Sequence, residues 1–145
     1  MTDNSFYDPI QGDRPPEVVF AEFCAATIAE IRTPLIALQG YSELLLMDKI
    51  APLTDQQKTV MKKIVRHANQ STDYASNLWD YASKRSYGQK ERDFLSNLTA
   101  IENNITVLLN GEVGIIDAQA QKCLVHMRDH IKRAYKNFNL LTSKY

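Results

Sequence analysis

Apolar residues recur every three or four positions along most of this chain. From residue 17 to about residue 48 they follow the spacing of an amphipathic α-helix that turns one face toward a core. A helix of this length would be roughly 45 Å long at 1.5 Å per residue. Its apolar positions are Phe20, Cys24, Ile28, Ile31, Leu35, Leu38 and Leu45.

Pro34 lies inside this first predicted helix. Proline has no amide hydrogen, so it removes one backbone hydrogen bond and can end a helix. The apolar spacing continues in phase beyond Pro34, which predicts that the helix continues through it. A helix that stops at Pro34 is the alternative.

Three further helices are predicted. Thr54 and Gln57 have the spacing of a capping box, which begins a second helix that runs to about residue 85. Residues 86–88 break the pattern, and a third helix follows and stops at residues 110–111, an Asn-Gly pair. Asp117 can cap a fourth helix. The expected core positions of these helices include Ile64, Ala68, Ala75, Leu78, Phe94, Leu98, Ile101, Ile105, Leu108, Met127, Ile131, Ala134, Phe138 and Leu141.

This order predicts an all-α protein, an antiparallel four-helix bundle built from two helical hairpins of one chain. Residues 1–16, rich in proline, form an irregular N-terminal arm. Residues 17–86 form the first hairpin, and residues 87–145 form a second, shorter hairpin that completes the bundle. The hairpins also resemble each other: the run Leu35–Gly40 parallels Thr106–Gly111, and the positions Met61, Ile64, His67 and Leu78 parallel Leu124, Met127, His130 and Leu141, with a shorter loop in the second hairpin.

Composition excludes several classes of function. The formal net charge is zero, so no overall field attracts nucleic acid or an anionic membrane. No apolar run approaches the ~20 residues that a membrane span needs, and no signal peptide is evident. Cys24 and Cys123 lie in apolar helical patterns, which predicts buried free thiols and a reducing compartment. We therefore expect a cytoplasmic protein.

Two runs of the first helix carry a recognisable motif. Residues 28–35 read IAEIRTPL and residues 40–46 read GYSELLL. They resemble the HisKA domain, the dimerisation and phosphoacceptor (DHp) domain of sensor histidine kinases, in which the corresponding runs read HELRTPL and GYxELL. The resemblance covers roughly residues 20–85. Ala29 stands where the family has its phosphoacceptor histidine.

The resemblance implies both a fold and a function. HisKA domains build a four-helix bundle from two chains, so this chain is expected to be a pseudo-dimer folded from one polypeptide. In the family, the histidine takes phosphate from ATP and passes it to an aspartate of a receiver domain. An alanine methyl group has no lone pair, and no nucleotide-binding motif follows residue 85, so we expect no kinase activity and no cofactor.

The expected function is therefore that of a non-catalytic protein of two-component signalling. It would bind a response-regulator receiver domain or a sensor histidine kinase and modulate phosphotransfer, as a monomeric pseudo-dimer or a weak homodimer, with no nucleic acid or membrane partner. Residues of the expected partner-binding face could also serve as ordinary core or surface. They are Ile28, Ala29, Glu30, Arg32, Thr33, Pro34 and Tyr74.

An enzymatic alternative uses Glu30 and Thr33. Their E-x-x-T spacing resembles the phosphatase signature of bifunctional kinases and puts both side chains on one helix face, a turn apart. There they could hold a water in line with an aspartyl phosphate of a receiver, which supplies the metal. The simpler interpretation is that both residues are surface positions, with Thr33 bonded back to its own helix.

The histidines open a third alternative, a histidine phosphotransfer protein that uses His67 or His130. His126 and His130 also have the i, i+4 spacing of two metal ligands, but no acidic or cysteine ligand nearby completes a set, so no metal site is expected. A purely structural bundle that keeps the motif for packing is the remaining possibility.

Overall fold

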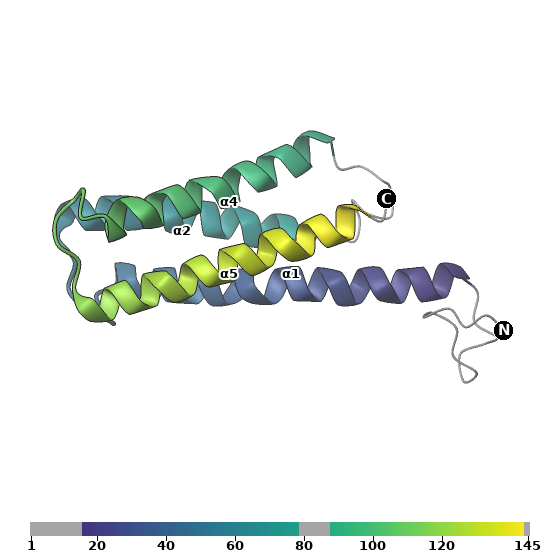
Figure 1. The fold of residues 1–145 in the computed structure, drawn as a ribbon, viewed down its shortest axis with the longest axis horizontal. Coiled ribbons are helices and arrows are strands. Elements are labelled where there is room, and N and C mark those ends of the chain that lie inside the picture. The colour runs from purple at the N-terminus through teal and green to yellow at the C-terminus, as the bar shows by residue number, and fades with distance from the viewer. Residues whose placement is uncertain (1–15, 79–87, 144–145) are drawn as a thin grey trace.

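The four predicted helices form one bundle. The structure, a computed structural model, describes residues 16–78 and 88–143. Its helices are α1 (Pro16–Leu46), α2 (Asp55–Ser76), α4 (Gly88–Leu109) and α5 (Ala118–Thr142), and they lie alongside one another (Figure 1). The all-α four-helix fold is thus confirmed. Except for Pro16, the expected N-terminal arm lies outside the described residues, as do residues 79–85 of the expected second helix.

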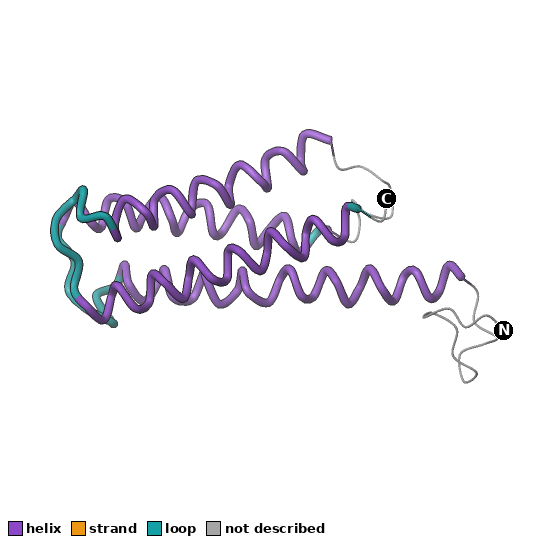
Figure 2. The backbone as a smooth tube through the Cα atoms, in the orientation of Figure 1, coloured by secondary structure: helices purple, strands orange, loops and turns teal. Residues whose placement is uncertain are grey.

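Each helix has two neighbours in the bundle. α1 packs against α2 and α5, and α4 packs against the same two helices from the other side. Consecutive helices run in opposite directions, and the loops 47–54 and 110–117 meet at the same end (Figures 1 and 2). α1 continues through Pro34, as the apolar spacing predicts.

The apolar stripes meet in a single core. All of the core positions named above for the last three predicted helices are buried, together with Ile31, Leu35, Leu38 and Leu45 of α1. Cys123 is a buried free thiol, as expected, and burial raises its pKa to about 11. Cys24 is also buried. In the part of the chain that the structure describes, no helix combines the length and the apolarity needed to cross a bilayer.

Hydrogen bonds fasten the loop end of the bundle. Thr54 and Gln57 form the expected capping box, with the Gln57 amide donating to Thr54 Oγ1 over 3.1 Å. The buried Gln57 side chain also donates from Nε2 to the Ile115 carbonyl over 3.1 Å, so it ties the loop 47–54 to the loop 110–117. Asp117 caps α5 by accepting from the Gln119 amide over 2.8 Å, as expected. Both hairpins are therefore fixed at one end.

The two hairpins are related by one uniform shift along the sequence. α1 and α4 end at Leu46 and Leu109, while α2 and α5 begin at Asp55 and Ala118, so both pairs stand 63 positions apart. The second loop is therefore as long as the first, and the expectation of a shorter one was wrong. Buried residues obey the same shift: Ile31 and Phe94, Leu35 and Leu98, Leu38 and Ile101, Leu45 and Leu108, Ile64 and Met127, and Leu78 and Leu141.

This register replaces the one expected from the sequence for the first helix of each hairpin. Leu35 corresponds to Leu98, not to Thr106. The expected register aligned residues of similar type near a glycine. In a bundle, however, the rotation of each helix is set by which residues are buried. Leu35 and Leu98 are both fully buried, so they correspond. In the second helices, the expected pairing of His67 with His130 agrees with the structural shift.

The difference between the core and the outer face of α1 can be tested with one residue type. Leu38 is fully buried, whereas Leu44 is 43% exposed. Leu38→Ala should lower the free energy of unfolding by about 2–5 kcal/mol because it leaves a cavity. Leu44→Ala should change it by less than about 1 kcal/mol. Urea denaturation of both variants checks this, and equal losses would contradict the described packing.

Candidate functional site

Four residues of the motif run 28–35 form an exposed surface of α1. Ala29, Glu30, Arg32 and Thr33 are all exposed, so the structure brings together four of the seven expected partner-binding residues. Ala29, which occupies the phosphoacceptor position, is therefore accessible. Ile28 packs partly buried against the core.

Glu30 and Thr33 lie one helical turn apart on this surface. The Thr33 hydroxyl makes no hydrogen bond with any described residue. By contrast, the hydroxyls of Thr59, Thr72 and Thr106 donate to the carbonyl four residues earlier, over 3.0–3.1 Å. Thr33 is therefore not bonded back to its own helix, and its hydroxyl remains available to a partner or a water.

Pro34 is buried, and it changes the hydrogen bonding of the motif. In an α-helix the amide of residue 34 would donate to the carbonyl of residue 30, but proline has no amide hydrogen. The Glu30 carbonyl instead accepts a hydrogen bond from Asn137 Nδ2 of α5, over 3.1 Å. The second hairpin thus satisfies the backbone group that the motif proline leaves open.

Tyr74 lies apart from the motif surface. Its ring stacks on Phe94 of α4 at 4.6 Å between centroids and meets the edge of Phe138 of α5 at 6.1 Å. Phe94 and Phe138 are themselves 4.8 Å apart. This aromatic cluster contributes to the core, and Tyr74 is only half exposed beside it. The structure does not bring Tyr74 together with the exposed motif residues.

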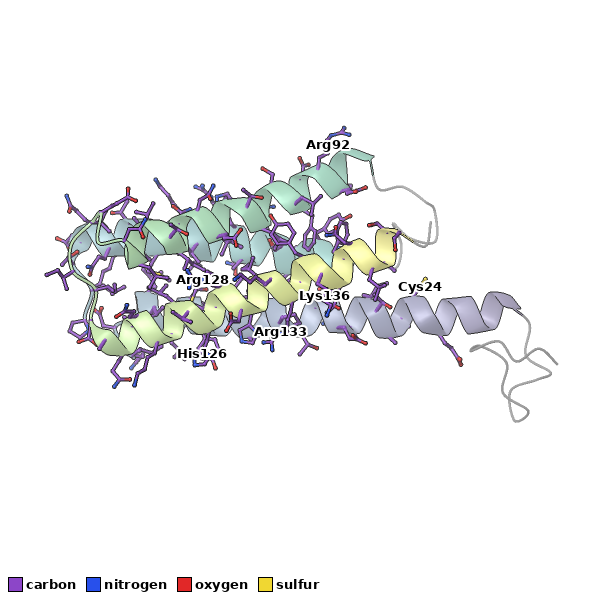
Figure 3. All side chains as sticks on the ribbon, in the orientation of Figure 1. Cys24, Arg92, His126, Arg128, Arg133 and Lys136 are labelled. Atoms are coloured by element: carbon purple, nitrogen blue, oxygen red, sulfur yellow. The ribbon has the colours of Figure 1, made fainter. Side chains whose placement is uncertain are left out.

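α5 borders the motif surface along a row of polar residues. The ring of His130 stacks on Tyr41 of α1 with centroids 5.9 Å apart, and Arg133 contacts His130 Nδ1. Asn137, one turn further along α5, reaches Glu30. Figure 3 shows His126, Arg128, Arg133 and Lys136 along α5. Burial lowers the pKa of His130, and the positive charges of Arg133 and His126 act in the same direction.

The histidines considered for phosphotransfer are both engaged in contacts. His67 is half-buried, with Nδ1 2.7 Å from Asn97 Oδ1 of α4. His130 stacks on Tyr41 and contacts Arg133. The contacts with Asn97 and Arg133 involve Nδ1 of the two rings, so phosphorylation at Nε2 would not have to break them. Among the described residues, no cluster of three or more His, Cys, Asp and Glu side chains could hold a metal ion.

An exposed apolar stripe on α1 continues from the motif, and sequence reasoning missed it. Ile36 and Leu44 of α1 are 48% and 43% exposed, Met47 directly after α1 is 58% exposed, and Gly40 lies between Ile36 and Leu44 on the same side. Leu44 follows Ile36 by eight residues and precedes Met47 by three, a helical spacing that was available in the sequence. It went unnoticed because the neighbouring core positions follow the same spacing. A stripe of this kind is typical of a surface that binds another protein.

A polar groove of about 440 Å³ lies between α2 and α4. Its walls carry two carboxylates, one amine, two aromatic rings and several amides and hydroxyls. The lining residues are Gln70, Asp73, Tyr74, Asn77, Lys90, Asp93, Phe94, Ser96 and Asn97.

The link between Pro34 and Asn137 can be tested with a double-mutant cycle. Asn137→Ala should lower the free energy of unfolding by about 1 kcal/mol, because the Glu30 carbonyl loses its donor. In a Pro34→Ala background the new amide at residue 34 can donate to that carbonyl, so Asn137→Ala should then cost less. Urea denaturation of the four proteins gives the coupling free energy. A coupling of zero would show that Asn137 and Pro34 act independently.

The lowered pKa of His130 predicts a pH-dependent stability. In the unfolded chain His130 takes up a proton near its ordinary pKa of 6.5. In the folded protein its pKa is lower, so it takes up the proton only at a lower pH. The contribution of His130 should therefore be complete above pH 6.5 and fall as the pH drops through the lower folded pKa. Between pH 8 and pH 5.5, the loss of unfolding free energy should be smaller in His130→Gln than in the parent. Identical losses in the two proteins would exclude this effect.

Comparison with known proteins identifies the first hairpin. Residues 22–86 match the model of the His Kinase A (phospho-acceptor) domain, HisKA. No curated protein and no solved structure matches the chain. The matched segment covers the exposed motif, the apolar stripe of α1 and the whole of α2. The match supports a role in two-component signalling, and it confirms the resemblance to the HisKA domain seen in the motif.

Proposed function

We propose that this protein is a non-catalytic binding partner in two-component signalling. It presents a HisKA-like surface without a phosphoacceptor to a receiver domain or a sensor kinase, and so modulates phosphotransfer. The observation that carries the proposal is the exposed motif of α1, which keeps Glu30, Arg32 and Thr33 at the surface while Ala29 replaces the histidine. The alanine methyl group cannot accept phosphate, so binding can occur without transfer.

The surface around the motif suits a contact with another protein, and we take a receiver domain as the first partner to test. Ile36, Leu44 and Met47 supply apolar area that binding would remove from water. The exposed polar residues Glu30, Arg32 and Thr33 lie at one end of this stripe and can form hydrogen bonds at its rim. Ile28 and Pro34 support the surface from beneath, since they are partly or fully buried. Tyr74 is not part of this contact.

Binding and phosphate loss should be measured together. The protein is mixed with receiver domains from the same genome, both unmodified and phosphorylated with a small-molecule phosphodonor. We expect at least one receiver to bind, with no acceleration of its dephosphorylation. Leu44→Glu should weaken this binding at least tenfold because it places a charge within the apolar stripe. Ile115→Glu, at a 95% exposed position in the loop, is the matched control and should not change the Kd.

A failure of every receiver to bind, in either state, would contradict the receiver as the partner. The same assay with the cytoplasmic part of a sensor kinase then tests the other partner class. Binding to a kinase that persists in Leu44→Glu would show that the apolar stripe is not the contact surface.

A receiver phosphatase is the second candidate, and the unbonded hydroxyl of Thr33 favours it. Glu30 and Thr33 could position a water for attack on an aspartyl phosphate whose magnesium ion the receiver supplies. Thr33→Ser keeps the hydroxyl and Thr33→Ala removes it. If the protein is a phosphatase, dephosphorylation should be faster than in the receiver alone, survive Thr33→Ser and be lost in Thr33→Ala. If it only binds, Thr33→Ala should leave the Kd within about threefold, since at most one neutral hydrogen bond is lost.

A further inference from the structure

The shift of 63 positions gives the bundle two comparable faces. The α1–α5 face consists of the exposed motif and apolar stripe of α1 with the adjoining edge of α5. The α4–α2 face consists of the residues 63 positions away on α4 and α2. Glu30 and Thr33 correspond to Asp93 and Ser96, so an acid and a hydroxyl three residues apart occur on both faces. This pair alone does not distinguish the two faces.

The apolar stripe distinguishes them. Ile36 corresponds to Thr99 and Met47 to Asn110, both polar and exposed, and Leu44 corresponds to the half-buried Val107. Among the described residues, α4 exposes no large hydrophobic side chain, whereas α1 exposes several. Among the described residues of the two faces, the large hydrophobic side chains that are exposed therefore lie on the α1–α5 face.

Charge distinguishes the faces as well. Arg133 of α5 lies between His130, which stacks on Tyr41, and Asn137, which bonds to the Glu30 carbonyl, so it lies alongside the part of α1 that contains Thr33. Arg133 and Lys136 are exposed cations (Figure 3). Their counterparts on α2 are Gln70 and Asp73, which line the polar groove. Beside the motif the α1–α5 face thus carries two cations, whereas the α4–α2 face carries Gln70 and Asp73, with Lys90 of α4 in the same groove.

We propose that the α1–α5 face alone binds a receiver domain, so that one chain binds one receiver. This inference rests on the proposed receiver-binding function. A receiver that carries an aspartyl phosphate presents negative charge, which Arg133 and Lys136 complement and Asp73 opposes. The apolar stripe adds the buried area that a specific contact needs. The second hairpin completes the bundle and supplies cations to the binding face, but it forms no second binding face.

Gly40 and its counterpart Asn103 provide a test that spares the fold. Gly40 is an exposed helical residue within the apolar stripe, and a Cβ atom added there would meet no atom within 4 Å. Glutamine also favours a helix more than glycine does, so Gly40→Gln should not lower the Tm. Its side chain would nevertheless stand in the contact surface. We expect Gly40→Gln to weaken receiver binding at least tenfold, and Asn103→Gln to leave the Kd within twofold.

A second pair of variants tests the charge. Arg133→Gln should weaken binding of the phosphorylated receiver severalfold and reduce its dependence on salt concentration. Asp73→Asn is the matched change on the α4–α2 face and should leave both quantities unchanged. Sedimentation equilibrium with excess receiver should give a complex of one chain and one receiver.

The outcomes separate this inference from the function on which it rests. Two receivers per chain, or equal weakening by Gly40→Gln and Asn103→Gln, would overturn the single binding face and leave receiver binding intact. Loss of binding in Asn103→Gln alone would assign the contact to the opposite face and also overturn the inference. Absence of binding by the parent protein to any receiver, in either state, would overturn both proposals.

Discussion

Mutual burial of four apolar stripes is the constraint on which this structure depends. A pair of amphipathic helices leaves part of each stripe open to water, because each helix covers only one side of the other. In this protein α1 and α2 carry the HisKA-like sequence, and α4 and α5 of the same chain cover what α1 and α2 leave open. Gln57 joins the loops at one end, and the rings of Tyr74, Phe94 and Phe138 pack together further along the bundle.

The second hairpin also forms a hydrogen bond with the motif. Pro34 leaves the carbonyl of Glu30 without its helical donor, and this carbonyl belongs to a residue of the exposed motif. Asn137 supplies the missing hydrogen bond from α5, a helix outside the matched segment. The local geometry of the motif is therefore tied to the packing of α5 against α1. The exposed surface and the bundle interior cannot be treated as independent parts.

Much of the fold could be predicted because its signals are local. The three-to-four-residue spacing of apolar positions locates the helices, and Thr54 with Gln57 and Asp117 fix where α2 and α5 begin. The register between the hairpins could not be predicted in this way, since several sequence offsets align apolar residues of one hairpin with apolar residues of the other. Likewise, Asn137 and Glu30 are far apart in the chain, and nothing near either residue indicates their contact.

The surface was harder to predict than the core, for a related reason. Ile36 and Leu44 have the same residue types and spacing as core positions, and only the rotational phase of α1 in the bundle places them outside. The place predicted for Tyr74 in the binding surface stays a prediction; in the structure its ring joins the aromatic cluster with Phe94 and Phe138. An aromatic residue near the end of a helix can pack into the core or form part of a binding surface, and the residues that surround it in space determine its role.

One polypeptide supplies all four helices of this bundle, and this affects which substitutions the protein can accept. In a bundle of two identical chains, every substitution occurs twice, once in each symmetry-related copy. Here a substitution on α1 has no obligatory counterpart on α4, so one side can diverge while the other preserves the packing. The association of the two halves is also intramolecular, so dilution does not separate them. Covalent linkage thus removes both the symmetry constraint and the dependence on protein concentration.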